Sequence, residues 1–151
     1  MAVSTTQAIW RSGGGDQTRT AYCGTGLMVA QFYIADASTA SSTNVVVSSA
    51  SGAPALILPA GAVVVSVVIN DAGAGSIDLG TTGYTSGTAS AAAIANNLSV
   101  ASVGTVTSGL TNTASTEMAY VTSRIDTSGS GTVGGYLLYF VTDPYIGQQN
   151  V

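Results

Sequence analysis

Residues 62–70, AVVVSVVIN, constrain the fold of this chain more than any other stretch. The side chains alternate with a period of two, which is typical of a half-buried β-strand. β-Branched residues dominate the stretch, and they fit a pleated sheet better than a helix. One face comprises Val63, Val65, Val67 and Ile69, and the other comprises Val64, Ser66, Val68 and Asn70. We therefore expect Val65 and Val67 in the protein interior, and the mixed second face can be covered by another layer.

The residues around this strand predict turns. Pro59 and Gly61 precede it, and proline is confined to strand ends and edges because it lacks the backbone donor. Residues 70–75, NDAGAG, follow it and contain residues that accept a positive φ. The alternation then resumes at 76–79, with Ile77 and Leu79 facing inward and Ser76 and Asp78 facing solvent. This pattern predicts a β-hairpin made of residues 62–70 and 76–79.

The rest of the chain predicts further short strands separated by turn residues. They lie at 27–34, 44–48, 56–58, 98–107, 117–125 and 133–141, and a Ser/Gly stretch at 127–131 reads as a hairpin connection. The alanine-rich residues 89–97 are the one place where a helix could form. About eight strands predict an all-β, jelly-roll-like antiparallel β-sandwich with extended terminal arms. We assign residues 1–20 to an N-terminal arm, 21–143 to the sandwich and 144–151 to a C-terminal tail.

The last strand, VGGYLLYFV, is apolar on both faces. Tyr136, Leu138 and Phe140 fall on one face, and Leu137, Tyr139 and Val141 fall on the other. A single sandwich core uses one face of a strand, so the other face must meet a second layer or another subunit. We therefore expect a homo-oligomer, with a trimer as the first choice.

Charge is scarce. Only 7% of the residues are charged, against about 25% in ordinary globular proteins. Two readings fit: a small domain with a Ser/Thr-rich surface, or a subunit packed against others. The net charge of −4 and only three arginines argue against a nucleic-acid partner. No secretory signal is visible, and the apolar run in 62–69 is far below the ~18 residues of a membrane-spanning helix.

The N-terminal arm carries one group of candidate interface residues, Ile9, Trp10 and Arg11, ahead of the glycine-rich break SGGGD. Trp and Arg are enriched at interaction hot spots, so Trp10 either anchors the arm on a neighbouring subunit or belongs to a free tail. Tyr145, in the C-terminal tail, is a further candidate interface residue. The single cysteine, Cys23, reads as a small buried apolar residue.

The sequence offers little material for catalysis. It has no His and no Lys, which excludes histidine-based triads, Schiff bases and imidazole metal sites, and one Cys cannot form a zinc site. Asp71, Asp78 and Asp126 leave open a glycosidase pair or an oxygen-ligated Ca²⁺ site. The spacing favours a turn-forming Asp71 and a solvent-facing Asp78 instead. We therefore predict no catalytic residue, no cofactor and no metal site, and we do not expect an enzyme.

The order of these segments resembles a known group of proteins. It comprises LPAGAVVVSVVI, a glycine-rich turn, SIDLGT, an alanine-rich segment, AYVTS, a Ser/Gly turn and GTVGGYLLYF, which together span residues 56–141. The pattern is similar to small structural proteins of tailed bacteriophages, especially of cyanophages and related marine phages. That group includes capsid decoration (cement) proteins and adhesion-type virion domains with jelly-roll-like folds.

The resemblance implies a structural virion protein, made in the host cytoplasm and placed on the outer surface of the phage head. There it would bind the major capsid protein as a cement subunit and stabilise contacts between capsomers. The alternative is a tail or fibre adhesin that binds host glycans, with Tyr84 and Tyr145 as an aromatic platform. The group supplies no catalytic residues.

Overall fold

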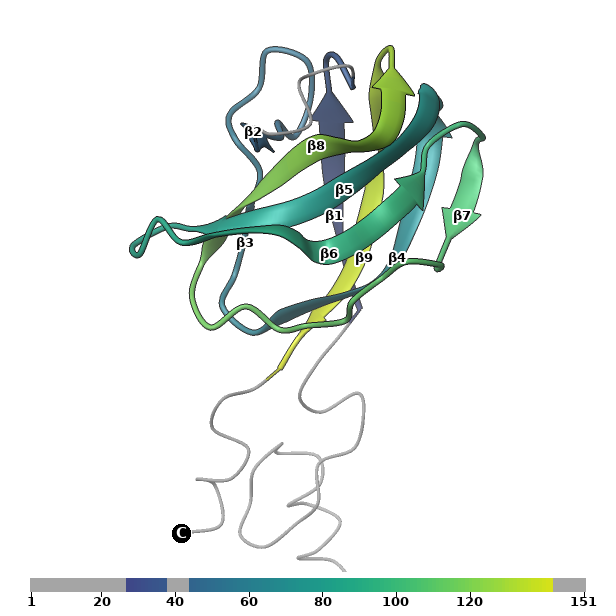
Figure 1. Cartoon of the computed structure of the whole chain (residues 1–151). Coiled ribbons are helices and arrows are strands. Elements are labelled where there is room, and N and C mark those ends of the chain that lie inside the picture. Colours follow the sequence, from purple (N-terminus) through teal and green to yellow (C-terminus); the bar gives the residue numbers. More distant parts are fainter. Residues whose placement is uncertain (1–26, 38–43, 143–151) are drawn as a thin grey trace, which may run out of the picture.

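The computed structural model describes residues 27–37 and 44–142, and all regular secondary structure in these two segments is β (Figure 1). The strands are β1 (Met28–Ile34), β2 (Val45–Val46), β3 (Ile57–Leu58), β4 (Ala62–Asp71), β5 (Ala74–Gly83), β6 (Ala89–Ser99), β7 (Gly104–Val106), β8 (Ala119–Ser130) and β9 (Val133–Val141). All of the strand pairs between them are antiparallel.

The strands form two sheets that pack face to face. Sheet A has four strands in the order β1-β9-β4-β7, and sheet B has the order β2-β8-β5-β6, with the short β3 also paired to β8. Apart from β3, consecutive strands lie in opposite sheets everywhere except at β5 and β6. Repeated crossing of the chain between a four-stranded and a five-stranded sheet is the jelly-roll arrangement. The predicted fold class is therefore confirmed.

The two predicted hairpins are wrong for the same reason. β4 and β5 belong to different sheets, and so do β8 and β9. β4 pairs with β9 and β7, and β5 pairs with β8 and β6, so the glycine-rich connections turn corners between the layers. The two corners touch: a Cβ on Gly73 would lie 2.7 Å from the carbonyl oxygen of Ser130, and Gly131 has a φ of 79°.

The helix predicted at residues 89–97 is also wrong, because these residues form most of β6. β6 pairs with β5 along the edge of sheet B. The high helix propensity of alanine is a weak preference, and here the backbone pairing with β5 outweighs it.

The hydrophobic core lies between the inner faces of the two sheets. Its fully buried side chains include Phe32, Val67, Ile69 and Leu137 from sheet A and Ile77, Leu79, Leu98 and Val121 from sheet B. Val67 is inside, as predicted. Val65 is only half-buried and outside the core cluster, which corrects the prediction for that residue. The register of β4 shifts between Val64 and Ser66, and this bulge changes the parity of the alternation.

Candidate interaction surface

The outer face of sheet A is apolar and carries no charged side chain in its centre. Residues directly opposite each other on antiparallel strands share a face, so the register of β1, β9 and β4 defines the rows. One row contains Val29, Leu138 and Ser66, the next contains Gln31, Tyr136 and Val68, and a third contains Phe140 and Val63. We call these residues the outer face of sheet A.

The side chains of the outer face of sheet A differ in exposure, and Val63 is only 7% exposed. Tyr136, Leu138, Phe140 and Val68 are half-buried, although the sandwich core lies on the other side of the sheet. Val29 is 61% exposed. Contiguous apolar side chains on the outer side of a sheet make this face the candidate interaction surface of the described domain.

The structure brings together some of the residues predicted from the sequence. Tyr136, Leu138 and Phe140 lie on this outer face, whereas Leu137 is fully buried in the core. Ile9, Trp10, Arg11, Cys23 and Tyr145 lie outside the described residues. Val63 lies opposite Phe140 in the register but is buried, at 7% exposure. Sequence reasoning missed Val29, which is recognised only once β1 is known to pair with β9.

The three candidate carboxylates do not form one site. In residues 27–37 and 44–142, no group of three or more His, Cys, Asp or Glu side chains is placed to hold a metal ion. Asp71 is exposed at the end of β4 in sheet A, and Asp78 is in the middle of β5 in sheet B.

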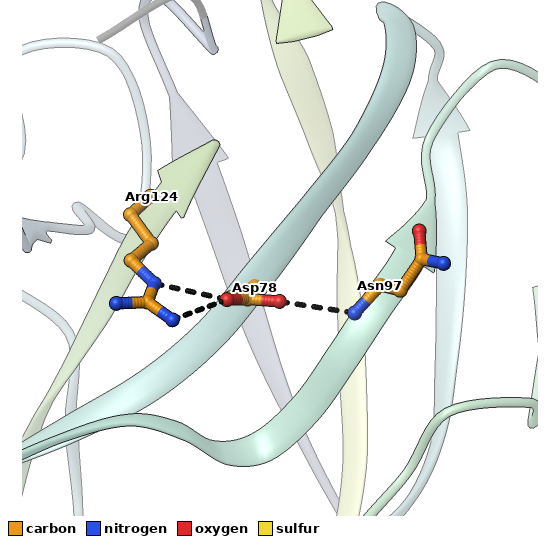
Figure 2. Close-up of polar contacts among 3 residues, drawn as sticks. All are labelled: Asp78, Asn97 and Arg124. Atoms are coloured by element: carbon orange, nitrogen blue, oxygen red, sulfur yellow. Dashed lines mark hydrogen bonds and ion pairs between the residues drawn. The ribbon is translucent and has the colours of Figure 1, made fainter. Parts of the chain in front are cut away.

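Asp78 has a structural role and is not solvent-facing, which corrects the prediction. It is 1% exposed. One carboxylate oxygen, Oδ2, accepts a hydrogen bond from Arg124 Nε at 2.9 Å and lies 2.8 Å from Arg124 Nη2 (Figure 2). The other, Oδ1, accepts a hydrogen bond from the backbone N–H of Asn97 at 3.0 Å. Both oxygens accept hydrogen bonds from protein donors, so this carboxylate links β5 to its two neighbouring strands.

The local backbone explains why Asp78 is needed. The β5–β6 register is interrupted between Ile77 and Leu79, and Asn97 in the interrupted segment has a φ of 56°. A donor in such a bulge cannot join the regular ladder. The Asp78 carboxylate supplies its acceptor, and Arg124 on the neighbouring strand β8 balances the charge.

Glu117 has a similar structural role at the other end of β5. Its Oε2 accepts the backbone N–H groups of Thr85 at 2.9 Å and Ser86 at 3.3 Å, in the turn between β5 and β6. Hydrogen bonding from the Ser86 side chain, and next from the Thr85 backbone, lowers the pKa of Glu117 below its ordinary value. The turn that it fixes projects from the sandwich (Figure 1).

Beside Glu117 lies a cavity of about 420 Å³ at the end of the sandwich opposite the two glycine corners. Its walls are formed by apolar residues of the sheets, by Ser and Thr side chains of β5 and β6, and by residues 112–117. Leu58, Ala62, Val64 and Ile94 form the apolar part. No cluster of titratable groups converges on it, because Glu117 is its one acidic or basic lining residue.

Tyr84 stands in the same projecting turn and is 51% exposed. Its ring lies 5.4 Å from that of Tyr120, centroid to centroid, with an angle of 35° between the planes. Part of the ring therefore packs on its own domain. The predicted pairing of Tyr84 with Tyr145 involves a residue outside the described part of the chain.

Comparisons with known proteins add two similar structures. No protein family matches the chain, and no curated protein matches it. A chain from the capsid of Ralstonia phage GP4 has a TM-score of 0.49 and 14% identity, covering 87% of this chain and 94% of its own length. A chain from the capsid asymmetric unit of cyanophage Pam1 has a TM-score of 0.43 and 18% identity, covering 79% of this chain and 87% of its own length. No residue role is transferred from either. Within the described segments there is no helix of the length and hydropathy needed to cross a membrane.

Proposed function

We propose that this chain is a structural protein of a tailed-phage virion, a decoration (cement) subunit on the outer surface of the head. Its partner is the major capsid protein, and it stabilises contacts between capsomers. The observation that carries the proposal is the outer face of sheet A, where Tyr136, Leu138 and Phe140 form an apolar layer on a jelly roll. The resemblance of residues 56–141 to phage structural proteins supports it.

The scarcity of charged side chains favours a subunit of an assembly over a freely diffusing monomer. The described residues contain five acidic side chains and one arginine, and that arginine is bound to Asp78. A domain with so few charges relies on apolar contact and shape for recognition. Such contact suits a subunit fixed in an array, and the proposed homotrimer would present several copies of the same face to the head.

We include residues 1–20 in the proposal as an attachment arm, with Ile9, Trp10 and Arg11 as its anchor. Burial of a Trp side chain removes about 150–250 Å² from water, which is a large contribution for a single residue. We expect that deletion of residues 1–12 leaves the β-sandwich folded and weakens its binding to heads. Full occupancy of heads by the truncated protein would show that the segment is not an anchor.

The alternative function is a tail or fibre adhesin for host glycans. The observation that favours it is the Tyr84–Tyr120 ring pair, because exposed aromatic rings on a projecting turn can stack on sugars. In that case the recognition surface is at the β5–β6 turn and not on sheet A.

One pair of variants separates the two functions. Leu138→Asp places a charge on the outer face of sheet A, next to but not inside the core, and Tyr84→Ser removes the exposed ring. For a cement protein, Leu138→Asp should lose binding to purified heads, and Tyr84→Ser should bind like the unmodified protein. The reverse result, with loss of cell or glycan binding in Tyr84→Ser, would support the adhesin.

Copy number gives a second measurement that needs no variant. A cement subunit should be present in the purified virion in an amount comparable with the major capsid protein, whereas an adhesin should be a small fraction of it. Band intensities on a gel of purified particles decide this. Circular dichroism of both variants is the control for folding.

A further inference from the structure

Within the part of the chain that the structure describes, β1 is an edge strand of sheet A, and its side away from β9 has no strand partner over most of its length. It pairs with β9 in unbroken register from Met28 to Ile34. On its other side, Tyr33 is the one β1 residue with a backbone partner among residues 27–37 and 44–142: its N–H donates to the Ser48 carbonyl at 2.8 Å, and its carbonyl accepts the Ser48 N–H at 3.2 Å.

The direction of the remaining backbone groups follows from Tyr33. In an antiparallel strand, the N–H and C=O of each residue point to the opposite side from those of its neighbours. The backbone N–H and C=O of Tyr33 point away from β9, so those of Gln31 and Val29 also point away from β9. The same holds for Leu27 if the strand is extended by one residue. Among the described residues, none makes a backbone hydrogen bond to Val29 or Gln31 on that side.

Residues 27–37 and 44–142 give this edge little of the usual protection. Proteins shield a free edge with charged side chains, proline, a bulge or a covering segment. Residues 27–31, LMVAQ, contain no charge and no proline, and the β1–β9 register has no bulge. Leu27 is 62% exposed, Met28 is 38% exposed and Val29 is 61% exposed. The strand therefore presents both unpaired backbone groups and apolar side chains.

We propose that β1 pairs in antiparallel fashion with β1 of a second copy of this chain, about a two-fold axis that passes between the two Val29 residues. This register pairs Val29 with Val29, and it pairs Leu27 with Gln31 twice. It uses every outward-pointing residue of the strand up to Tyr33. A register that also paired Tyr33 with the second copy is blocked, because the backbone N–H and C=O of Tyr33 are already hydrogen-bonded to Ser48.

A second copy fits this edge better than a charged partner does. Two antiparallel copies have matching backbone direction by symmetry, and the neutral residues 27–31 bring no like charges face to face. Val29 lies opposite Leu138 in the same row of sheet A. The pairing therefore joins the outer faces of sheet A of two copies into one continuous apolar surface.

This two-fold contact between β1 strands is separate from the three-fold contacts of the proposed homotrimer. If the protein is a trimer, the β1 contact joins one trimer to the next. It also does not depend on the location of the protein in a virion. The test uses purified full-length protein without phage heads, so its failure leaves the proposed function to its own experiments.

Cysteine crosslinking tests the register, in a Cys23→Ser background so that the native thiol cannot react. Directly opposed, hydrogen-bonded residues have Cα atoms about 5.5 Å apart, which is within the range that a disulfide can bridge. We expect Val29→Cys to form a covalent dimer under mild oxidation. Met28→Cys is the matched control: its copies are diagonal neighbours at about 7–8 Å, too far apart for efficient bridging.

Backbone substitution gives an independent readout. Val29→Pro removes the outward-pointing N–H and leaves the donors that face β9 in place, and proline is tolerated at such edge positions. We expect Val29→Pro to lower the mass measured by light scattering by a factor of two, and Val29→Thr, which keeps the donor, to leave it unchanged.

Three results would overturn the proposal. Val29→Cys could remain uncrosslinked, or crosslink no better than Met28→Cys. Folded Val29→Pro, with an unchanged circular dichroism spectrum, could keep the full mass. Crosslinking of Val29→Cys could require removal of residues 1–26, which would mean that this segment, and not a second copy, covers the edge.

Discussion

The ion pair between Asp78 and Arg124 should respond unequally to removal of its two members. The Asp78 side chain is 1% exposed, whereas the Arg124 side chain is 35% exposed. If Asp78 is replaced by Ala, the guanidinium can regain water through its exposed side. If Arg124 is replaced by Met, a buried carboxylate remains with the Asn97 N–H as its one other hydrogen-bond donor. We therefore expect Arg124→Met to be the more destabilising substitution.

The magnitudes follow from these exposures. Removal of one partner from a buried pair costs about 3–5 kcal/mol when it strands the other charge, and this range applies to Arg124→Met. Asp78→Ala leaves the partly exposed Arg124 guanidinium and the Asn97 N–H without their acceptor, and an unsatisfied donor costs about 1–3 kcal/mol. Asn97 is itself exposed, so the lower half of that range applies. The expected difference between the two variants is about 1–4 kcal/mol.

Urea unfolding followed by far-UV circular dichroism measures both values. Tryptophan fluorescence is unsuitable, because the one Trp of the chain is Trp10, outside the described domain. In the double variant Asp78→Ala/Arg124→Met no charge is stranded, so it should be more stable than Arg124→Met alone. Equal losses for the two single variants, or a larger loss for Asp78→Ala, would refute the reasoning from burial.

Three further predictions concern the core, the β5–β6 contact and acid stability. Val67→Asp should abolish soluble folding, since Val67 is 0% exposed, whereas the half-buried Val65→Asp should yield folded protein of lower stability; equal damage from both would contradict the bulge in β4. Gly80→Ala places a Cβ 2.2 Å from a carbonyl oxygen of β6 and should lower the free energy of unfolding, measured in urea, clearly more than Gly87→Ala does. The Cβ of Gly87→Ala meets no atom within 4 Å, so that variant should lose only about 1 kcal/mol, because of its positive φ. Glu117 has a lowered pKa in the folded state, so its ionised form stabilises the fold at neutral pH, and this contribution is lost as the pH falls below the ordinary value of 4.5 and through the lowered folded-state pKa. The difference in unfolding free energy between the unmodified protein and Glu117→Gln should therefore shrink on acidification, and a constant difference would speak against the role of Glu117.

The layer architecture could be read from the sequence, because alternation and turn residues are local signals. Most strands lie where the pattern placed them, including β1, β4 and β9. The pairing of the strands could not be read in the same way. The turns at 70–75 and 127–131 look like hairpin turns in sequence, but each connects opposite sheets. Only the partners of a strand, which lie far away in the chain, decide whether a glycine-rich turn closes a hairpin or turns a corner.

The candidate surface could be predicted in part for similar reasons. Tyr136 and Leu138 were found because β9 alternates without interruption and is apolar on both faces. Val65 was assigned to the interior together with Val67, but a bulge between Val64 and Ser66 changes the parity of β4, and no residue type marks a bulge reliably. Asp78 was assigned to solvent because the distorted segment of β6 that needs its carboxylate is remote in sequence.

The positions of Leu27 and Thr142 have a mechanical consequence. β1 begins and β9 ends at the same pole of the sandwich, and the two strands are antiparallel neighbours with Met28 opposite Tyr139 (Figure 1). A force that pulls these two ends apart is parallel to the hydrogen bonds between β1 and β9. It therefore loads the bonds nearest the ends first and does not load all bonds of the ladder together. The bonds are then loaded one pair at a time, starting at Met28, and β1 peels from the sheet at low force. A domain attached through both ends would yield by unzipping, whereas attachment through a broad face of the sheet would distribute the same load over many contacts.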